Sequence, residues 1–212
     1  MLKVGLTGGI ASGKSTVARM LVALGAHLVD TDQLARVAVE PGSPALAEIV
    51  AAFGPGVLED SGGLDRRRLR EVVFNDPAAR ARLNAIVHPR VAALAEAELK
   101  ALERAHPRGV ALVDVPLLFE SGWDRSYPLT LLVYAPAETQ VARLMARDQV
   151  DEVQARAALA AQMPMDDKRE RANFIIDNAR GLEETLTQVR AVWDKLLKLA
   201  APESQPELAD LN

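Results

Sequence analysis

The feature that most constrains the fold is a glycine-rich segment near the N-terminus, residues 8–15, with the sequence GGIASGKS. It fits the phosphate-loop pattern G-x-x-x-x-G-K-[ST] without a gap. Residues 2–6 have the apolar character of a short buried strand, and residues 16–24 favour a helix that ends at Gly25. The alternative is a glycine-rich turn of the dinucleotide type, in which Lys14 and Ser15 would have no packing role. Strand, loop and helix therefore predict a polyphosphate-binding loop.

The chemistry of this loop follows from its residue types. Glycines at positions 8, 9 and 13 allow successive backbone N–H groups to point inward, and the helix that follows directs its positive dipole end at the same place. Lys14 is expected to reach the β and γ phosphates of a nucleoside triphosphate. The Ser15 hydroxyl is expected to bind the Mg²⁺ that bridges those phosphates.

The amino-acid composition limits the classes of protein to which this chain can belong. The 212 residues, 49% hydrophobic and 25% charged, suit one α/β core with room for a smaller inserted region. The absence of cysteine excludes disulfides, thiolate metal ligands and a cysteine nucleophile. A net charge of −4 argues against nucleic-acid or anionic-membrane partners, and no apolar segment approaches the ~20 residues of a membrane helix. Without a signal-peptide pattern, a cytoplasmic location is expected.

Five apolar runs separated by helical segments predict a parallel α/β fold. The predicted strands are residues 2–6, 26–30, 110–115, 129–134 and 174–177. Later helices are expected over residues 137–147, 151–162 and 182–199.

Between the second and third strands, residues 41–106 contain helix signals and no convincing strand. Ser43 and Asp65 have the spacing of helix N-caps. One helix is expected to end at His88 and a second to open at Pro89. This stretch therefore resembles a helical insertion that would bind a substrate.

Carboxylates follow two of the predicted strands. Asp30 and Asp32 come at the end of the second strand, and ligands bind at that end of open parallel sheets. Asp32 is either the N-cap of the next helix or a catalytic base, and its spacing supports both roles equally. Asp114 ends the third strand, where a Walker-B aspartate would lie.

Basic residues supply further candidates. Residues 66–70 include four arginines, which form either a solvated helix face or phosphate contacts. His88 is either a core histidine at a helix junction, which is the commoner case, or a ligand contact. Arg143 and Arg147 share one face of a helix, so residues 137–171 predict a cationic lid over a nucleotide. An ordinary solvent-facing helix pair is the alternative.

Together these motifs resemble the bacterial dephospho-coenzyme A kinases over about residues 2–200. The resemblance rests on Leu6 through Thr16, Asp30-Thr31-Asp32 with Ala35-Arg36, Glu40-Pro41-Gly42, Asn84, His88-Pro89, Pro116-Leu117-Leu118-Phe119-Glu120, Arg143 through Asp148, Gln162-Met163 and Ile176-Asp177-Asn178. One departure bears on the adenine-side loop. After Asp177-Asn178 the family usually has a glycine within two residues, whereas here Ala179-Arg180 precedes Gly181.

The resemblance implies a P-loop kinase fold with a five-stranded parallel sheet flanked by helices. The core would comprise residues 1–40, 107–136 and 172–200, the coenzyme-A-binding insertion residues 41–106, the lid residues 137–171, and a disordered tail residues 201–212. The implied reaction is transfer of the γ-phosphoryl group of ATP, with Mg²⁺, to the ribose 3′-hydroxyl of dephospho-CoA, the last step of coenzyme A synthesis. A monomer or weak homo-oligomer that binds only these small molecules is expected.

The resemblance also implies roles for individual residues. Asp32 would be the base, and Lys14 and Arg143 would stabilise the transferring group. ATP-binding residues would be Gly8, Gly9, Ile10, Ala11, Ser12, Gly13, Lys14, Ser15, Thr16, Arg143, Arg147 and Asn178. Acceptor-side residues would be Thr7, Asp32, Arg66, His88, Leu118 and Glu120, and the metal ligand would be Ser15. A kinase of the same fold acting on a nucleoside, nucleotide or shikimate-like acceptor is the nearest rival, and a nucleotide-dependent switch protein is another, although no N-K-x-D guanine motif occurs.

Overall fold

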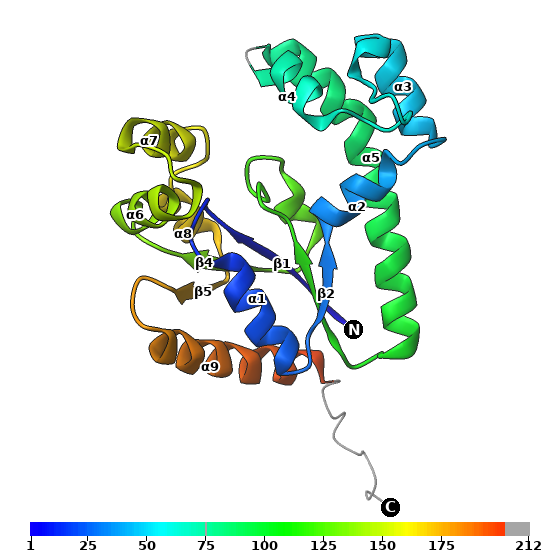
Figure 1. Cartoon of the computed structure of the whole chain (residues 1–212). Coiled ribbons are helices and arrows are strands. Elements are labelled where there is room, and N and C mark those ends of the chain that lie inside the picture. The colour runs from blue at the N-terminus through cyan, green and yellow to red at the C-terminus, as the bar shows by residue number, and fades with distance from the viewer. Residues whose placement is uncertain (75, 202–212) are drawn as a thin grey trace, which may run out of the picture. The chain divides into compact units, whose positions relative to one another are not determined.

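The computed structural model describes residues 1–74 and 76–201, so all of the predicted tail except residue 201 lies outside the described residues. Five strands form one sheet in the order β2-β3-β1-β4-β5, which confirms the predicted five-stranded sheet (Figure 1). The strands are β1 (Leu2–Gly8), β2 (His27–Asp30), β3 (Val110–Asp114), β4 (Leu129–Tyr134) and β5 (Phe174–Asp177).

The central strand is β1, which pairs in parallel with β3 on one side and with β4 on the other. Val4 lies opposite Leu112 of β3 and Leu129 of β4. Every residue of β3 is buried, as expected for the continuous apolar sequence of a strand covered on both faces. The carboxyl ends of these strands therefore open at one edge of the sheet, where β1 runs directly into the glycine loop.

Two compact units are distinguished by their internal contacts, one formed by residues 1–28 and 102–201 and the other by residues 29–101. In the first unit, α1 (Lys14–Ala23) and α9 (Leu182–Ala200) pack side by side and share one hydrophobic core with the sheet (Figure 1). Leu21 of α1 and Trp193 of α9 are among the buried residues of that core. The predicted lid segment belongs to this unit and contains α6 (Ala137–Asp148), α7 (Glu152–Ala160) and α8 (Met165–Arg171).

The second unit is helical, with α2 (Thr31–Ala38), α3 (Pro44–Phe53), α4 (Arg66–Phe74) and most of α5 (Pro77–Ala105). Residues 29–40, expected from the sequence to belong with the sheet, are grouped here. The two predicted caps are confirmed, because the Ser43 hydroxyl accepts from the Leu46 amide and the Asp65 carboxylate accepts from two amides at the start of α4.

The predicted helix boundary at Pro89 is wrong. The helix α5 runs through this residue without interruption. Proline costs the helix one N–H donor, but buried apolar residues on both sides, Ala79 and Val91 among them, keep the two halves packed. The Arg90 side chain also donates to the carbonyl of Ile86 one turn earlier, which adds a hydrogen bond beside the proline.

Neither these helices nor any other in the described residues is long and apolar enough to cross a membrane.

A pair of histidines stacks in the first unit, with the ring centroids of His27 and His106 4.2 Å apart. Burial, and secondarily the charge of His106, hold the pKa of His27 below its ordinary value of 6.5. Because the unfolded chain then binds a proton more readily, the stability contributed by neutral His27 is complete above pH 6.5 and is lost as the pH falls toward the lower folded pKa.

We therefore expect His27→Gln to reduce the pH dependence of stability. The measurement is urea unfolding of the wild type and the variant at pH 7.5 and pH 5.5. The wild type should lose more unfolding free energy than the variant between these two values. Equal losses would show that this histidine pair does not contribute to acid sensitivity.

Candidate active site

The phosphate loop lies between β1 and α1, as the sequence predicts. Its chain reverses at Ala11 and Gly13, whose φ angles are 57° and 90°. The amide of Ser12 donates to the carbonyl of Gly9 at 3.1 Å, and α1 begins at Lys14. A left-handed conformation at a residue with a side chain is strained, and such strain concentrates at functional loops. Among the described residues the buried Ser12 hydroxyl has no hydrogen-bond partner, which suits a loop shaped to receive phosphate oxygens.

The glycines of this loop are also required by close packing. A Cβ at Gly9 would overlap the side-chain Nε2 of Gln140, and a Cβ at Gly13 would overlap Nδ2 of Asn178. Ile10 and Ala11 pack against a small apolar core that α6 and α7 form between them. The loop is therefore enclosed by α6 and α7 on one side and by the segment after β5 on the other.

We expect Gly13→Ala to destabilise the protein beyond the cost of its backbone conformation. The matched control is Gly122→Ala, because Gly122 has a similar left-handed conformation but no atom within 4 Å of an added Cβ. The control should lose roughly 1–2 kcal/mol of unfolding free energy from the left-handed backbone alone. In chemical denaturation Gly13→Ala should lose clearly more, because Asn178 must move. Equal losses would contradict the packing described above.

The Lys14 ammonium forms an ion pair with the carboxylate of Asp114 at the end of β3. Asp114 is only 8% exposed. The structure thus places an acid beside the loop lysine, at the position the sequence indicates for a Walker-B aspartate.

Arg143 extends from α6 to the segment after β5. Its guanidinium donates to the carbonyl of Asn178 at 2.7 Å and approaches the carbonyl of Ser12 at 3.4 Å. The Asn178 side chain in turn donates to the same Ser12 carbonyl at 2.8 Å and accepts from the Thr185 hydroxyl at 2.9 Å. Arg143 and Asn178, two predicted ATP-binding residues, are therefore joined through the phosphate loop.

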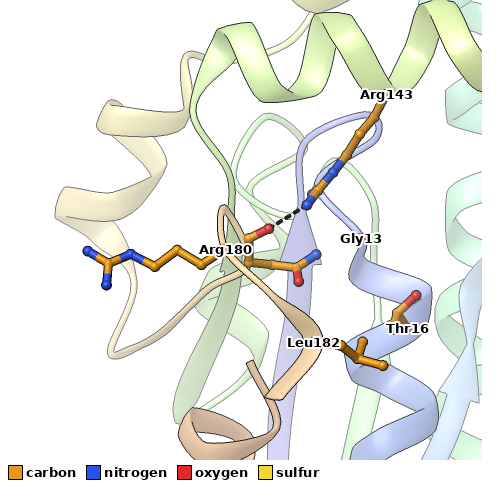
Figure 2. A pocket seen from close by; sticks show the side chains of 6 residues that line it. Gly13, Thr16, Arg143, Arg180 and Leu182 are labelled. Carbon is orange, nitrogen blue, oxygen red and sulfur yellow. Dashed lines mark hydrogen bonds between the residues drawn. The ribbon is translucent and has the colours of Figure 1, made fainter. Parts of the chain in front are cut away.

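Arg143 and Asn178 line a cavity of about 370 Å³ beside the start of α1. Its lining comprises Gly13, Thr16, Arg143, Asn178, Arg180 and Leu182. Figure 2 shows Arg143 pointing toward the loop after β5, while the Arg180 side chain points away from Gly13. The departure at Ala179-Arg180 thus contributes a wall of the cavity without directing its charge inward.

Arg147, also predicted to bind ATP, has a different environment. Its exposed guanidinium forms two hydrogen bonds with the carboxylate of Asp148, at 2.7 and 2.8 Å. These bonds raise the pKa of Arg147 and lower the pKa of Asp148. Contact of Arg147 with a nucleotide would require it to leave this partner.

Two glutamines hold the phosphate loop, and neither was assigned to the predicted site. Gln140 donates to the carbonyl of Ile10 at 2.7 Å, and Gln162 accepts from the amide of Ile10 at 2.9 Å. Gln162 belongs to a motif already noted, and Gln140 lies three residues before Arg143, on the same side of α6. That spacing is the signal that would have indicated Gln140.

Three predicted acceptor-side residues make contacts within the first unit. The Thr7 hydroxyl is buried and donates to the carbonyl of Pro116 at 3.1 Å, and the Leu118 side chain is fully buried. Glu120 forms an ion pair with the buried Lys168 at 2.7 Å. The packing of the first two side chains and the pairing of the third give each of them a structural role.

The remaining acceptor-side predictions lie in the second unit. The N-cap of α2 is Asp30, whose carboxylate accepts from the amides of Asp32 and Gln33 at 2.9 and 3.0 Å. The N-cap alternative for Asp32 is therefore wrong. The Asp32 side chain is exposed in the first turn of α2, where it takes no part in capping.

Arg66 is exposed at the start of α4, as are the other three arginines of the run. His88 lies inside α5, where burial lowers its pKa below 6.5.

Comparison with known proteins decides the family. A family model described as dephospho-CoA kinase matches residues 2–184 of the 212-residue chain. The chain belongs to the dephospho-CoA kinase family. The dephospho-CoA kinase of Moorella thermoacetica is 46% identical over 206 residues, which cover 97% of each chain. That of Thermobifida fusca is 49% identical over 196 residues, covering 92% of this chain and 96% of the relative.

Solved structures agree with the family in fold. A protein from Thermus thermophilus has a TM-score of 0.80 and 40% identity, covering 92% of this chain and 97% of its own. The dephospho-CoA kinase of Campylobacter jejuni has a TM-score of 0.71 and 27% identity, covering 94% of this chain and 98% of its own. The predicted family resemblance is confirmed.

Proposed function

We propose that this protein transfers the γ-phosphoryl group of ATP to the ribose 3′-hydroxyl of dephospho-CoA, giving ADP and CoA. The observation that carries the proposal is the phosphate loop closed by Arg143 and Asn178, in a chain of the dephospho-CoA kinase family. Backbone amides and the Lys14 ammonium are suited to bind the β and γ phosphates. Arg143 is placed to meet charge that develops on the transferring group.

On the acceptor side, Asp32 is proposed to accept the proton of the ribose hydroxyl. A ribose hydroxyl is a weak nucleophile until a carboxylate accepts its proton and orients its oxygen toward the γ-phosphorus. Asp32 is exposed and its neighbour Asp30 does the capping, so its carboxylate is available for this work. Arg66 and His88 are proposed to bind the acceptor from the same helical unit.

The donors near the loop fit a magnesium ion. Ser15 is exposed in the first turn of α1, and Asp114 ends the adjacent strand β3. Both offer oxygen atoms, which Mg²⁺ prefers, and Mg²⁺ usually takes few protein ligands beside phosphates and water. Among the described residues no cluster of three acidic, histidine or cysteine side chains forms a separate metal site. Bound there, the ion would neutralise charge on the β and γ phosphates.

An acceptor comparison tests the proposed function. The purified protein is incubated with ATP and Mg²⁺ and, in turn, with dephospho-CoA, a nucleoside, a nucleotide and shikimate, and ADP and the phosphorylated product are measured by mass. ADP should form at a high rate only with dephospho-CoA. A faster reaction with another acceptor would favour the rival kinase, and hydrolysis of ATP unaffected by any acceptor would favour a switch protein. A cytosolic location and a monomer or weak homo-oligomer stay predictions.

A further inference from the structure

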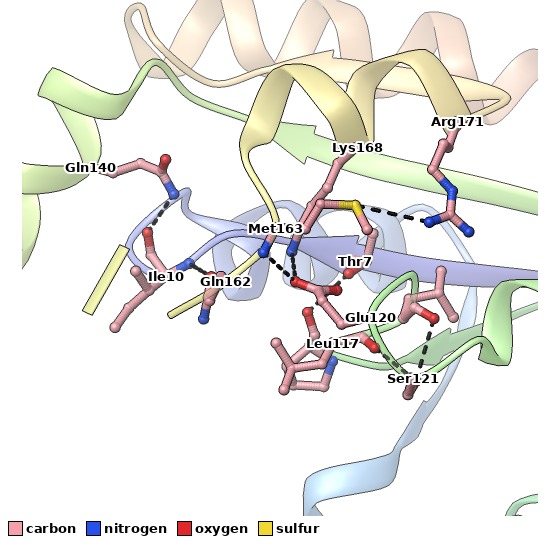
Figure 3. Close-up of polar contacts among 12 residues, drawn as sticks. Thr7, Ile10, Leu117, Glu120, Ser121, Gln140, Gln162, Met163, Lys168 and Arg171 are labelled. Carbon is pink, nitrogen blue, oxygen red and sulfur yellow. Dashed lines mark hydrogen bonds and ion pairs between the residues drawn. The ribbon is translucent and has the colours of Figure 1, made fainter. Parts of the chain in front are cut away.

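A buried lysine links the lid segment to the loop after β3. Lys168 of α8 has no exposed surface, and its Nζ lies 2.7 Å from Oε1 of Glu120 (Figure 3). Among the described residues this Nζ has no hydrogen bond of regular geometry, so the ion pair is its compensation for burial. Removing an ammonium from water is strongly unfavourable before its partner is counted, and burying an apolar side chain of similar length carries no such penalty. The pair therefore calls for a role beyond packing.

The Glu120 carboxylate also fixes the backbone of the turn before α8. The same Oε1 atom that meets Lys168 accepts from the amide of Met163 at 3.0 Å. Pro164 follows as the N-cap residue of α8, and its carbonyl accepts from the Lys168 amide at 3.1 Å. The Oε1 atom of Glu120 therefore contacts the turn at both ends, at the Met163 amide and at the Lys168 ammonium.

The next residue back along this turn reaches the phosphate loop. Gln162 precedes Met163, and its Oε1 accepts from the amide of Ile10 at 2.9 Å (Figure 3). Gln140 holds the carbonyl of the same residue from α6. Because Ile10 is held at both of its peptide groups, a displaced turn would release one of the two contacts that shape the loop.

We propose that Lys168 is a positioning residue for the phosphate loop. With Glu120 it holds the turn at Met163, and the turn holds Gln162 against the Ile10 amide. This assigns Glu120 to the nucleotide side through Lys168, in place of the acceptor contact predicted from the sequence. The proposal rests on the proposed function only for its kinetic readout, because nucleotide binding reports the same effect without any acceptor.

The test compares three variants: Lys168→Met, Gln162→Ala and the double variant. For each, the dissociation constant of ADP is measured by calorimetry and the KM values of both substrates by steady-state kinetics. Each single variant should weaken ADP binding and raise the KM for ATP by roughly tenfold, the equivalent of one lost hydrogen bond to a well-placed group. The KM for dephospho-CoA should change much less. The double variant should be no weaker than the worse single variant, because both substitutions remove the same restraint.

Arg169→Gln is the matched control, since Arg169 lies in the same helix but stacks over the ring of Tyr134, 5.3 Å from its centroid. It should leave ADP binding within about twofold of the wild type. Effects of Lys168→Met and Gln162→Ala that multiply in the double variant, or unchanged ADP binding in Lys168→Met, would overturn the proposal.

A folding defect in Lys168→Met is addressed by adding Glu120→Gln, which removes the unpaired charge and keeps an oxygen for the Met163 amide. Thermal unfolding of this Glu120→Gln/Lys168→Met protein should return toward the wild-type midpoint while its ADP binding stays weak. Recovery of both would show that the ion pair only stabilises the fold, and would also overturn the proposal. Suppose instead that the wild type fails to make CoA while the variants change ADP binding as expected above. That result would contradict the proposed function and leave the role of Lys168 intact.

Discussion

Asp32→Asn is expected to lower kcat by a factor on the order of 10² or more while leaving ATP binding near normal. The amide keeps the size and most of the polarity of the carboxylate but cannot accept the proton of the ribose hydroxyl. Because Asp30 caps α2, the substitution at Asp32 leaves the hydrogen bonds that start the helix in place. The measurement is steady-state turnover with saturating dephospho-CoA, together with the dissociation constant of ATP.

Asp30→Asn is the control for this prediction, because it makes the same chemical change two residues away and asparagine is an equally good N-cap. It should change kcat by no more than a few-fold, since its capping role needs only a side-chain oxygen. Near wild-type turnover in Asp32→Asn would remove Asp32 as the base. A large loss in Asp30→Asn alone would assign the proton to the other aspartate of the pair.

Arg143→Ala is expected to reduce kcat by a factor on the order of 10³, because an arginine that meets the transferring group contributes 10³ to 10⁵ in related phosphoryl transfers. The guanidinium also donates to the Asn178 carbonyl at 2.7 Å, so its loss should loosen the wall of the cavity beside α1 and raise the KM for ATP. Single-turnover rates with saturating ATP would separate the chemical step from this weaker binding.

Two comparisons sharpen the test of Arg143. Arg143→Lys keeps the charge but not the two-pronged donor geometry, so it should recover only part of the rate. Arg190→Ala, which removes an exposed arginine of α9, should have wild-type kinetics. If Arg143→Ala changed neither kcat nor the KM for ATP, the proposed role of Arg143 would be wrong.

The sheet and the phosphate loop could be predicted from the sequence because their signals are local. A glycine pattern between an apolar run and a helix indicates a phosphate loop within a few consecutive residues, and buried parallel strands are apolar throughout. The caps at Ser43 and Asp65 were predicted for the same reason. In each case the residues that determine the structure are neighbours in the chain.

The contacts around the loop could not be predicted in this way, because they join distant residues. Gln140 and Gln162 are 130 and 152 positions from Ile10, and Lys168 of α8 meets Glu120 of the loop after β3. Which of two aspartates caps α2 depends on backbone angles, since Asp30 has the extended conformation of an N-cap residue. Tertiary packing, rather than local preference, also carries α5 through Pro89.

The proposed reaction is tested most directly by locating the new phosphate on the product. The protein is mixed with ATP, Mg²⁺ and dephospho-CoA, and the purified product is examined by ³¹P NMR and mass spectrometry. The proposed reaction should give one added phosphomonoester, on the ribose 3′-oxygen, in an amount equal to the ADP released. ADP accompanied by inorganic phosphate and unchanged dephospho-CoA, or a phosphate on another oxygen of the acceptor, would contradict it.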